Sequence, residues 1–323
     1  MWWILWVLLA IVVLGILPTM FVSWIIYSTL LLRRSSHKWG RQQSLPKDEE
    51  YVRLYEQGMQ WRETYLSSKK DVQITNDGLA LYGEYFDFGA DRAVIIIPGR
   101  MEACHYSCHY AEPYRKSGWN VLTIDGRAHG LSEGHVSSVG QKEYSDILAW
   151  ARFLHDQCQN TQVVLHGVCI GSSTAVFAAT DQACPAYVSG VVVDGLYQRF
   201  FDSFRNHMTE GHRPLFPFLW ETMLLIRLFS RVDVVHDGPI YRMDRLDKPI
   251  LFLHSREDLF STPEKAQELF NRCASTKKAL HWFEHGGHSR IRILNPDEYD
   301  STIQAFFSTA EFTTGKAAYI SAR

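Results

Sequence analysis

The sequence predicts an α/β domain built on a mostly parallel sheet, with one apolar helix in front of it. From about residue 71 onward, short apolar segments of strand length alternate with longer segments of helix length. Several of the apolar segments are nearly continuous runs, as expected for strands that helices cover on both faces. The 323 residues leave room for an N-terminal helix and one large domain.

The N-terminal segment is the first predicted element, because residues 2–32 contain no charged side chain. A helix of this length measures about 46 Å, enough for one tilted or kinked crossing of a hydrocarbon core of about 30 Å but not for two. Tryptophans at its start, and Trp24 and Tyr27 nearer its end, suit the two membrane interfaces. A cleaved signal peptide is the alternative, but a basic start and a clear cleavage site are missing. We predict a transmembrane anchor over residues 1–32.

The charges that follow this segment predict its orientation. Five Lys and Arg residues lie between residues 33 and 47, and the first acidic residue is Asp48. This bias places the large domain on the cytoplasmic side of the membrane. The six cysteines show no disulfide spacing, which agrees with a reducing compartment. The net charge of −2 gives no reason to expect a nucleic-acid partner, and the oligomeric state stays open.

The remaining elements follow in chain order. Residues 33–70 are interpreted as a linker on the domain edge, with a helix around 49–65. Residues 71–88 are interpreted as two strands joined by a hairpin turn at Asn76-Asp77-Gly78. Strands and helices then alternate to residue 310, and a tail follows over 311–323. The expected strands are 93–98, 120–125, 162–166, 188–194, 249–254 and 280–284, and the expected helices are 103–117, 141–158, 172–183, 263–273 and 297–308.

Residues 199–248 interrupt this alternation. The segment is too long for a simple connection between two strands, and it is rich in Phe, Leu and Trp. We expect a helical cap inserted over the carboxyl edge of the sheet, where open α/β sheets bind ligands.

The pentapeptide Gly167-Val168-Cys169-Ile170-Gly171 follows one of the expected strands and precedes a helix of small residues. It has the form of the G-x-S-x-G nucleophile elbow, with cysteine in place of serine. The elbow holds its nucleophile in a strained conformation, and the two glycines remove Cβ atoms that would clash. The turn also places the Ile170 N–H and a helix N-terminus beside Cys169, which favours a thiolate and an oxyanion. The alternative is that Cys169 is a small, inert packing residue.

A nucleophile at an elbow needs an acid and then a histidine further along the chain. Asp258 lies in the turn after the expected strand 249–254, and His288 lies in the loop after the last strand. His288 would accept the thiol proton, and Asp258 would hold the imidazole in the required tautomer. Three alternatives remain open: His285 as the base, Glu257 as the acid and Asp194 as the acid.

A second oxyanion donor is expected in the loop after strand 93–98, where Gly99 allows close approach. The candidate is the Arg100 N–H or, failing that, the Met101 N–H. The side chains of Arg100 and Glu102 either pair with each other at the surface or contact a polar head group of the substrate.

The segment Cys104-His105-Tyr106-Ser107-Cys108-His109 raises the question of a metal site. If it is helical, its two cysteines and its two histidines form i,i+4 pairs on adjacent faces. Four side chains on two faces cannot easily converge on one zinc ion. We therefore expect helix packing beside the cleft, and neither a metal nor another cofactor.

The stretch TIDGRAHGLSEG at residues 123–134 resembles the D-x-R-x-x-G-x-S signature of α/β-hydrolases. Residues 98–134 as a whole are similar to the matching stretch of bacterial lysophospholipases and monoacylglycerol lipases in the serine aminopeptidase S33-like group. By element order the resemblance covers residues 71–310, and it implies the α/β-hydrolase fold. The site residues that it implies are Cys169, Asp258 and His288 as the catalytic triad, with Arg100 and Ile170 as oxyanion donors.

The sequence departs from these relatives at two places. They have serine at the position of Cys169, and usually His-Gly at the position of Pro98-Gly99. Cysteine there resembles instead dienelactone hydrolases, polyhydroxyalkanoate synthases and bile-acid-CoA acyltransferases, which use cysteine in the same fold. The expected function is cleavage of a carboxylic ester or thioester, with a small lipophilic acyl substrate and an acyl-enzyme, next to the lipid bilayer. The alternatives are an acyltransferase with the same triad and a non-catalytic binding protein of this fold.

Overall fold

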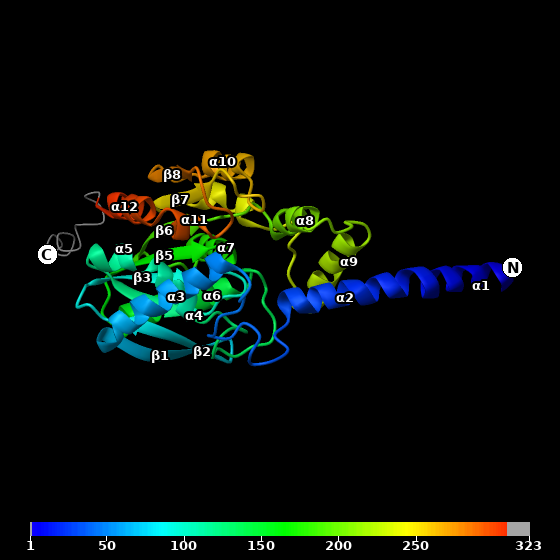
Figure 1. Cartoon of the computed structure of the whole chain (residues 1–323), viewed down its shortest axis with the longest axis horizontal. Coiled ribbons are helices and arrows are strands. Elements are labelled where there is room, and N and C mark those ends of the chain that lie inside the picture. The colour runs from blue at the N-terminus through cyan, green and yellow to red at the C-terminus, as the bar shows by residue number, and fades with distance from the viewer. Residues whose placement is uncertain (1, 309–323) are drawn as a thin grey trace.

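Figure 1 shows the computed structural model of the chain, which describes residues 2–308. One long helix projects from a layered α/β domain. It consists of α1 (Trp2–Ile11), a π-helical turn (Val12–Ile16) and α2 (Leu17–Leu31). The predicted tail over 311–323 lies outside the described residues.

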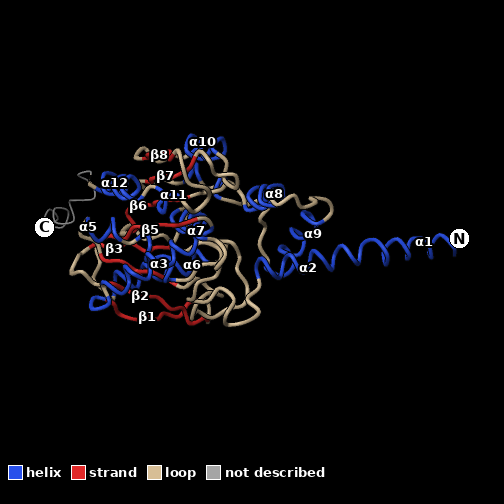
Figure 2. Tube along the Cα trace, in the orientation of Figure 1, coloured by secondary structure: helices blue, strands red, loops and turns tan. Residues whose placement is uncertain are grey.

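An eight-stranded sheet forms the centre of the domain (Figure 2, red), in the order β1-β2-β4-β3-β5-β6-β7-β8. β1 pairs antiparallel with β2, and β2 pairs antiparallel with β4, whereas the other neighbours are parallel. The prediction of a mostly parallel sheet is therefore confirmed. The strands are β1 (Lys69–Asn76), β2 (Leu79–Phe86), β3 (Arg92–Ile97), β4 (Asn120–Ile124), β5 (Gln162–Val168), β6 (Val188–Asp194), β7 (Ile250–Ser255) and β8 (Lys278–Phe283).

Helices cover both faces of this sheet. Along β3, the side chain of Ile95 belongs to one buried apolar cluster and those of Val94 and Ile96 belong to another, because a pleated strand points alternate side chains to opposite faces. The continuous apolar runs in the sequence follow from this burial on two sides. The first cluster lies under α6 (Glu143–Asp156), α7 (Ile170–Ala179) and α10 (Pro263–Arg272), and the second under α3 (Glu49–Thr64), α5 (Glu112–Lys116) and α12 (Pro296–Phe307).

The hairpin prediction is confirmed by the turn between β1 and β2. Asp77 and Gly78 have φ angles of 50° and 74°, which suits a two-residue turn between antiparallel strands. The prediction of one helix over 103–117 is wrong. The segment is divided into α4 (Cys104–Ser107), a 3₁₀ turn (Cys108–Tyr110) and α5. Pro113 lies in the first turn of α5, where a residue that has no N–H to donate is tolerated, but it could not continue a helix from α4.

The cap lies between β6 and β7 and contains α8 (Phe200–Glu210) and α9 (Phe218–Leu225), followed by a π-helical turn (Ile226–Ser230). A short helix, α11 (Ile291–Leu294), follows the last strand. In Figure 1 the cap extends from the carboxyl edge of the sheet toward the projecting helix.

The second half of the projecting helix packs against the cap. Tyr27 and Leu31 of α2 are fully buried in one apolar cluster with cap residues. Thr19 and Ser23 each donate a hydrogen bond of 2.7 Å to the Glu221 carboxylate of α9. Residues 2–18 are exposed on all sides. The helix therefore has one half that packs on the domain and an apolar half that is exposed.

Candidate active site

Cys169 lies in the turn from β5 to α7, at the carboxyl edge of the sheet. Its φ and ψ angles are 55° and −114°, a conformation that residues with a side chain rarely adopt. The Cys169 N–H donates to the Asp194 carbonyl oxygen at 2.9 Å, which ties the turn to β6. The thiol is free and partly exposed, and it faces a cavity of about 240 Å³. The strained turn thus presents the sulfur to a space that can hold a substrate.

Two glycines make this turn possible. A Cβ atom at Gly167 would lie 2.2 Å from the carbonyl carbon of Gly171, and a Cβ atom at Gly171 would lie 2.1 Å from the Ile97 carbonyl oxygen. Both distances are far inside van der Waals contact. The close packing of α7 against β3 and β5 therefore requires glycine at both positions.

His288 and Asp258 are brought together by the loops after β8 and β7. His288 Nδ1 lies 2.8 Å from Asp258 Oδ2, so the imidazole donates to the carboxylate. The other carboxylate oxygen accepts the backbone N–H groups of Phe260 and Ser261 at 2.9 and 2.8 Å. Although burial alone would raise the pKa of Asp258, His288 and these hydrogen bonds hold it below its ordinary value. Asp258 is thus a fixed, ionised acceptor.

His288 lines the same cavity as Cys169. Burial lowers the pKa of His288, but the negative charges of Asp258 and of the Cys169 thiolate, and hydrogen bonds to both groups, raise it well above its ordinary value. A proton on the imidazole is therefore favoured while the sulfur is a thiolate.

The alternative base and the two alternative acids make other contacts. His285 pairs with Glu257 at 3.2 Å on the surface, where both side chains are exposed. Asp194 accepts a hydrogen bond of 3.0 Å from Tyr299, and burial raises the pKa of its carboxyl to about 7. Within residues 2–308, no hydrogen bond joins Asp194 or Glu257 to His288. The geometry favours Asp258 and His288.

Gly195 was missed by the sequence reasoning. It follows Asp194 with φ of 64°, and a Cβ atom there would lie 3.1 Å from His288 Cε1. The absence of a side chain thus leaves space for the imidazole ring. The Asp-Gly pair at the end of the expected strand 188–194 was a usable turn signal.

Two backbone N–H groups are available as oxyanion donors. Ile170 and Arg100 line the cavity together with Cys169. Among the described residues, neither backbone N–H donates to a protein acceptor. The two N–H groups are therefore free to stabilise an oxyanion that develops in this cavity.

Glu102 shapes the loop that carries Arg100. Its buried carboxylate accepts the Gly99 N–H at 2.8 Å and the Tyr51 hydroxyl at 3.0 Å, and burial raises the pKa of this carboxyl. Glu102 makes no ion pair with Arg100, so the surface ion pair considered from the sequence is not formed. This role of Glu102 had no clear signal in the sequence.

The D-x-R-x-x-G-x-S segment supports the same loop. His129 Nε2 donates to the Arg100 carbonyl oxygen at 2.7 Å, and the Trp39 ring stacks on the His129 ring at 4.7 Å. Asp125 accepts the Cys104 N–H at 2.9 Å, and a Cβ atom at Gly130 would lie 2.1 Å from its carboxyl carbon. The segment therefore stabilises the loop that carries Arg100.

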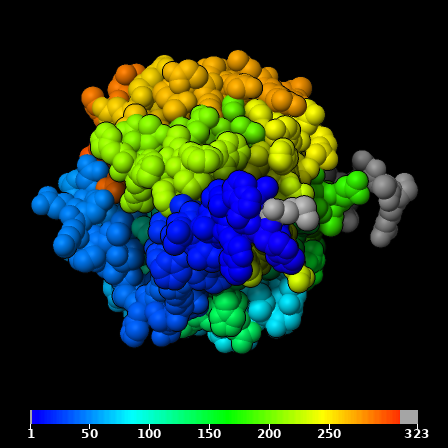
Figure 3. Space-filling view, turned by 90° about the vertical axis from the view of Figure 1, so that its right-hand side faces the viewer, coloured from blue at the N-terminus to red at the C-terminus, as the bar shows by residue number. Residues whose placement is uncertain are grey.

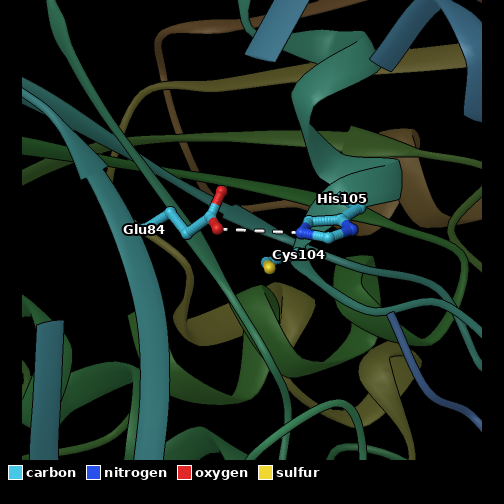
Figure 4. Close-up of side chains that lie close together, drawn as sticks. All are labelled: Glu84, Cys104 and His105. Atoms are coloured by element: carbon cyan, nitrogen blue, oxygen red, sulfur yellow. Dashed lines mark ion pairs between the residues drawn. The ribbon is translucent and has the colours of Figure 1, made fainter. Parts of the chain in front are cut away.

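Figure 4 shows the group of Glu84, Cys104 and His105, whose possible ligand atoms lie within 4.8 Å of one another. Arg62 donates two hydrogen bonds of 2.7 and 2.8 Å to the Glu84 carboxylate, and Arg41 Nη1 lies 3.5 Å from it. Because two arginines already balance this carboxylate, a metal ion would meet strong repulsion. Burial also raises the pKa of the Cys104 thiol, which opposes the thiolate that a metal needs. These contacts favour a structural ion-pair centre.

Comparison with known proteins supports the fold. Residues 92–222 match the family model described as the alpha/beta hydrolase fold. The chain has the α/β-hydrolase fold. The Pyrococcus furiosus esterase Pf2001 superposes with a TM-score of 0.65 at 24% identity, over 76% of this chain and 92% of that one.

Two further relatives of this α/β-hydrolase-fold chain extend the comparison. An alpha/beta hydrolase fold protein from Chitinophaga pinensis has a TM-score of 0.54 at 13% identity, over 75% of this chain and 98% of its own. The Bacillus subtilis protein YqkD is 26% identical over 226 residues, which cover 67% of this chain and 73% of YqkD. Cys169, Asp258 and His288 stand in the chain order in which α/β-hydrolases carry nucleophile, acid and histidine.

Proposed function

We propose that this chain cleaves a carboxylic ester or thioester through an acyl-enzyme on Cys169, with His288 as the base and Asp258 as the residue that orients it. One observation carries the proposal. The thiol of Cys169, on a turn with a strained backbone, lines the same cavity as the His288 imidazole, which donates a hydrogen bond to the buried Asp258 carboxylate. The fold match and the likeness to an esterase support this reaction class.

The proposed reaction has two halves. The thiolate attacks the acyl carbon, and the carbonyl oxygen becomes an oxyanion that the N–H groups of Ile170 and Arg100 stabilise. The carbon–oxygen or carbon–sulfur bond of the substrate then breaks, and the leaving group takes the proton from His288. In the second half His288 takes a proton from water, the hydroxide attacks the thioester, and the acid leaves as the sulfur regains its charge. An alcohol or amine in place of water would give acyl transfer, which product analysis distinguishes.

Thiol labelling tests the proposed nucleophile. At about pH 6 an ordinary thiol, with a pKa of about 8.5, is mostly protonated and reacts slowly. Because its raised pKa keeps His288 protonated at this pH, in the cavity that it shares with Cys169, we expect iodoacetamide to modify Cys169 at least about tenfold faster than Cys158. Peptide mass spectrometry at several times measures both rates.

Asp258→Asn is the matched control for this experiment. Loss of the carboxylate lowers the pKa of His288, so the imidazolium loses its proton at a lower pH and labelling of Cys169 at pH 6 slows. The rate at Cys158 is expected to stay the same. Equal rates at Cys169 and Cys158 in the unsubstituted protein would argue against a catalytic thiol.

We also propose that the projecting helix remains part of the protein and spans a membrane, with the domain on the cytoplasmic side. The helix over Trp2–Leu31 is long and apolar enough to cross a bilayer, and a signal sequence near an N-terminus has the same properties. Burial of Tyr27 and Leu31 in the cap favours retention, because cleavage after the helix would expose this cluster.

The cap surface beside the helix supports membrane contact. Figure 3 views the molecule from the N-terminal side, where the cap (yellow-green) lies against the helix (dark blue). Phe216, Trp220 and Phe229 of this region are largely exposed. Exposed aromatic side chains next to an apolar helix are suited to the interfacial layer of a bilayer.

We expect that an alkaline carbonate wash does not release the protein from membranes. Cells that express the full chain should yield the protein in the membrane pellet after the wash, with an intact mass that includes residues 2–31. A soluble protein with a mass that lacks this segment would identify a signal sequence and contradict the anchor. Protease added to sealed cells is expected to leave the domain intact if it lies in the cytoplasm.

A further inference from the structure

A second cavity, of about 580 Å³, adjoins the catalytic one. Arg100, Phe204 and His207 line both cavities, so the two spaces share a wall. From α2, this second cavity is lined by Ile25, Ile26, Thr29 and Leu30. It therefore lies between the catalytic site and the part of the helix that enters the proposed membrane.

This second cavity is cationic. Its charged or titratable lining side chains are His37, Lys38, Arg100, His207 and Arg213, and no acidic side chain of the described residues lines it. Burial lowers the pKa of His207, and the positive charges of Arg100 and Arg213 lower it further. Burial, Arg34 and Arg100 together lower the pKa of Lys38 to about 8. The lowered pKa values disfavour protons on His207 and Lys38, so Arg100 and Arg213 supply the permanent positive charge of this space.

Arg100 differs from three other partly buried arginines of the chain. Arg290 pairs with Asp48 at 2.6 Å, Arg62 pairs with Glu84 at 2.7 Å, and Arg127 pairs with Asp146 at 2.7 Å. The guanidinium of Arg100 makes no hydrogen bond or ion pair with any described residue. Burial lowers its pKa, and a negative charge on Cys169 opposes this only in part. A partly buried cation without a hydrogen-bonded counter-ion costs stability. A bound anion would remove this cost.

A third, mostly apolar cavity continues from the second toward the membrane end of α2. It has about 340 Å³ and shares Ile26, Phe204 and Arg213 with the second cavity. Val22 and Phe218 provide further apolar lining. The three adjoining cavities could therefore hold one amphiphilic ligand, with its reactive bond beside Cys169, its charged group in the second cavity and an apolar part in the third.

We propose that the second cavity is a subsite for the phosphate group of the acyl substrate, with Arg100 and Arg213 as its principal ligands. The proposal rests on the proposed acyl cleavage at Cys169, which lies in the adjoining cavity. Guanidinium groups bind phosphate oxygens through paired, charge-assisted hydrogen bonds. Such a phosphate belongs either to a lipid head group that enters from the bilayer or to a soluble acyl thioester such as an acyl-CoA.

Equilibrium binding to Cys169→Ala protein tests the subsite without any need for turnover. The first probe pair is 1-oleoyl lysophosphatidate and monooleoylglycerol, which differ by one phosphate. The second pair is S-octanoyl-4′-phosphopantetheine and S-octanoyl-pantetheine, which are the thiol end of an acyl-CoA with and without one phosphate. Isothermal titration calorimetry of the full chain in one detergent gives Kd for all four. We expect the phosphate-bearing member of at least one pair to bind about tenfold tighter or more.

The double substitution Arg100→Gln/Arg213→Gln, in the Cys169→Ala background, is expected to remove this preference. Arg53→Gln, at an exposed arginine of α3 outside the three cavities, is the matched control and should keep it. If the double variant does not fold, Arg213→Gln alone, at an exposed residue, is measured instead, and it should reduce the preference for the phosphate-bearing probe. A preference confined to the first pair indicates a lipid source, and one confined to the second pair a soluble thioester.

Two results would overturn the subsite. One is equal affinity within both probe pairs, and the other is a phosphate preference that survives both the double and the single substitution in folded protein. The failure of the proposed function is a separate result. If unsubstituted protein binds the phosphate-bearing probes with the expected preference but cleaves neither, the subsite stands and the cleavage proposal is wrong.

Discussion

Cys169→Ala is expected to lower kcat for acyl-ester cleavage by about four orders of magnitude or more. The substitution removes the attacking sulfur, while the oxyanion donors and His288 stay in place. The nearby Ser172 hydroxyl cannot replace it, because Ser172 Oγ is buried and donates to the carbonyl oxygens of Gly167 and Asp194. The rate with p-nitrophenyl octanoate, measured on full-length protein, checks this expectation.

The proposed acyl-enzyme intermediate can also be detected directly. After a short incubation with substrate, intact-mass spectrometry should show one octanoyl group on unsubstituted protein and none on Cys169→Ala. Cys158→Ala is the control, since Cys158 is also a free, partly exposed cysteine but does not line the cavity. If Cys169→Ala retains more than a tenth of the activity, another residue is the nucleophile and the proposed mechanism fails.

The fold was predictable because its signals are local. Burial of β3 on both faces gives an unbroken apolar run, and the two-residue turn at Asp77 and Gly78 requires a residue pair that is easy to recognise. The elbow was predictable for a similar reason, since five consecutive residues contain the nucleophile and both glycines. The order of acid and histidine after it follows from the order of the strands.

The rest of the site depends on contacts between distant segments. His129 holds the Arg100 carbonyl, Glu102 holds the Gly99 N–H, and Gly195 makes room for His288. The motif around His129 and the turn signal at Gly195 mark these positions in the sequence, but neither says which distant residue will lie beside them. The packing of α2 on the cap is similar. A uniformly apolar segment does not reveal that Tyr27 and Leu31 face protein while residues 2–18 do not. The cationic cavity arises only when this packing brings α2 and α8 beside Arg100.

Gly171→Ala is expected to destabilise the folded protein by about 3 kcal/mol or more, or to prevent folding. The added methyl group would lie 2.1 Å from the Ile97 carbonyl oxygen, which is a backbone atom. β3 cannot easily yield, because it is hydrogen-bonded to β4 on one side and to β5 on the other. Urea unfolding followed by circular dichroism measures the free energy of unfolding.

Gly287→Ala is the matched control for this measurement. A Cβ atom at Gly287 would have no other atom within 4 Å, and the backbone there is not left-handed, so the same added methyl group should change stability by less than about 0.5 kcal/mol. The comparison separates the loss of a glycine from the loss of a specific close contact. If Gly171→Ala were as stable as Gly287→Ala, β3 and α7 would not be in contact at this point. The backbone of Cys169 would then have no reason to stay in its strained conformation, and the sulfur would not be held toward the cavity.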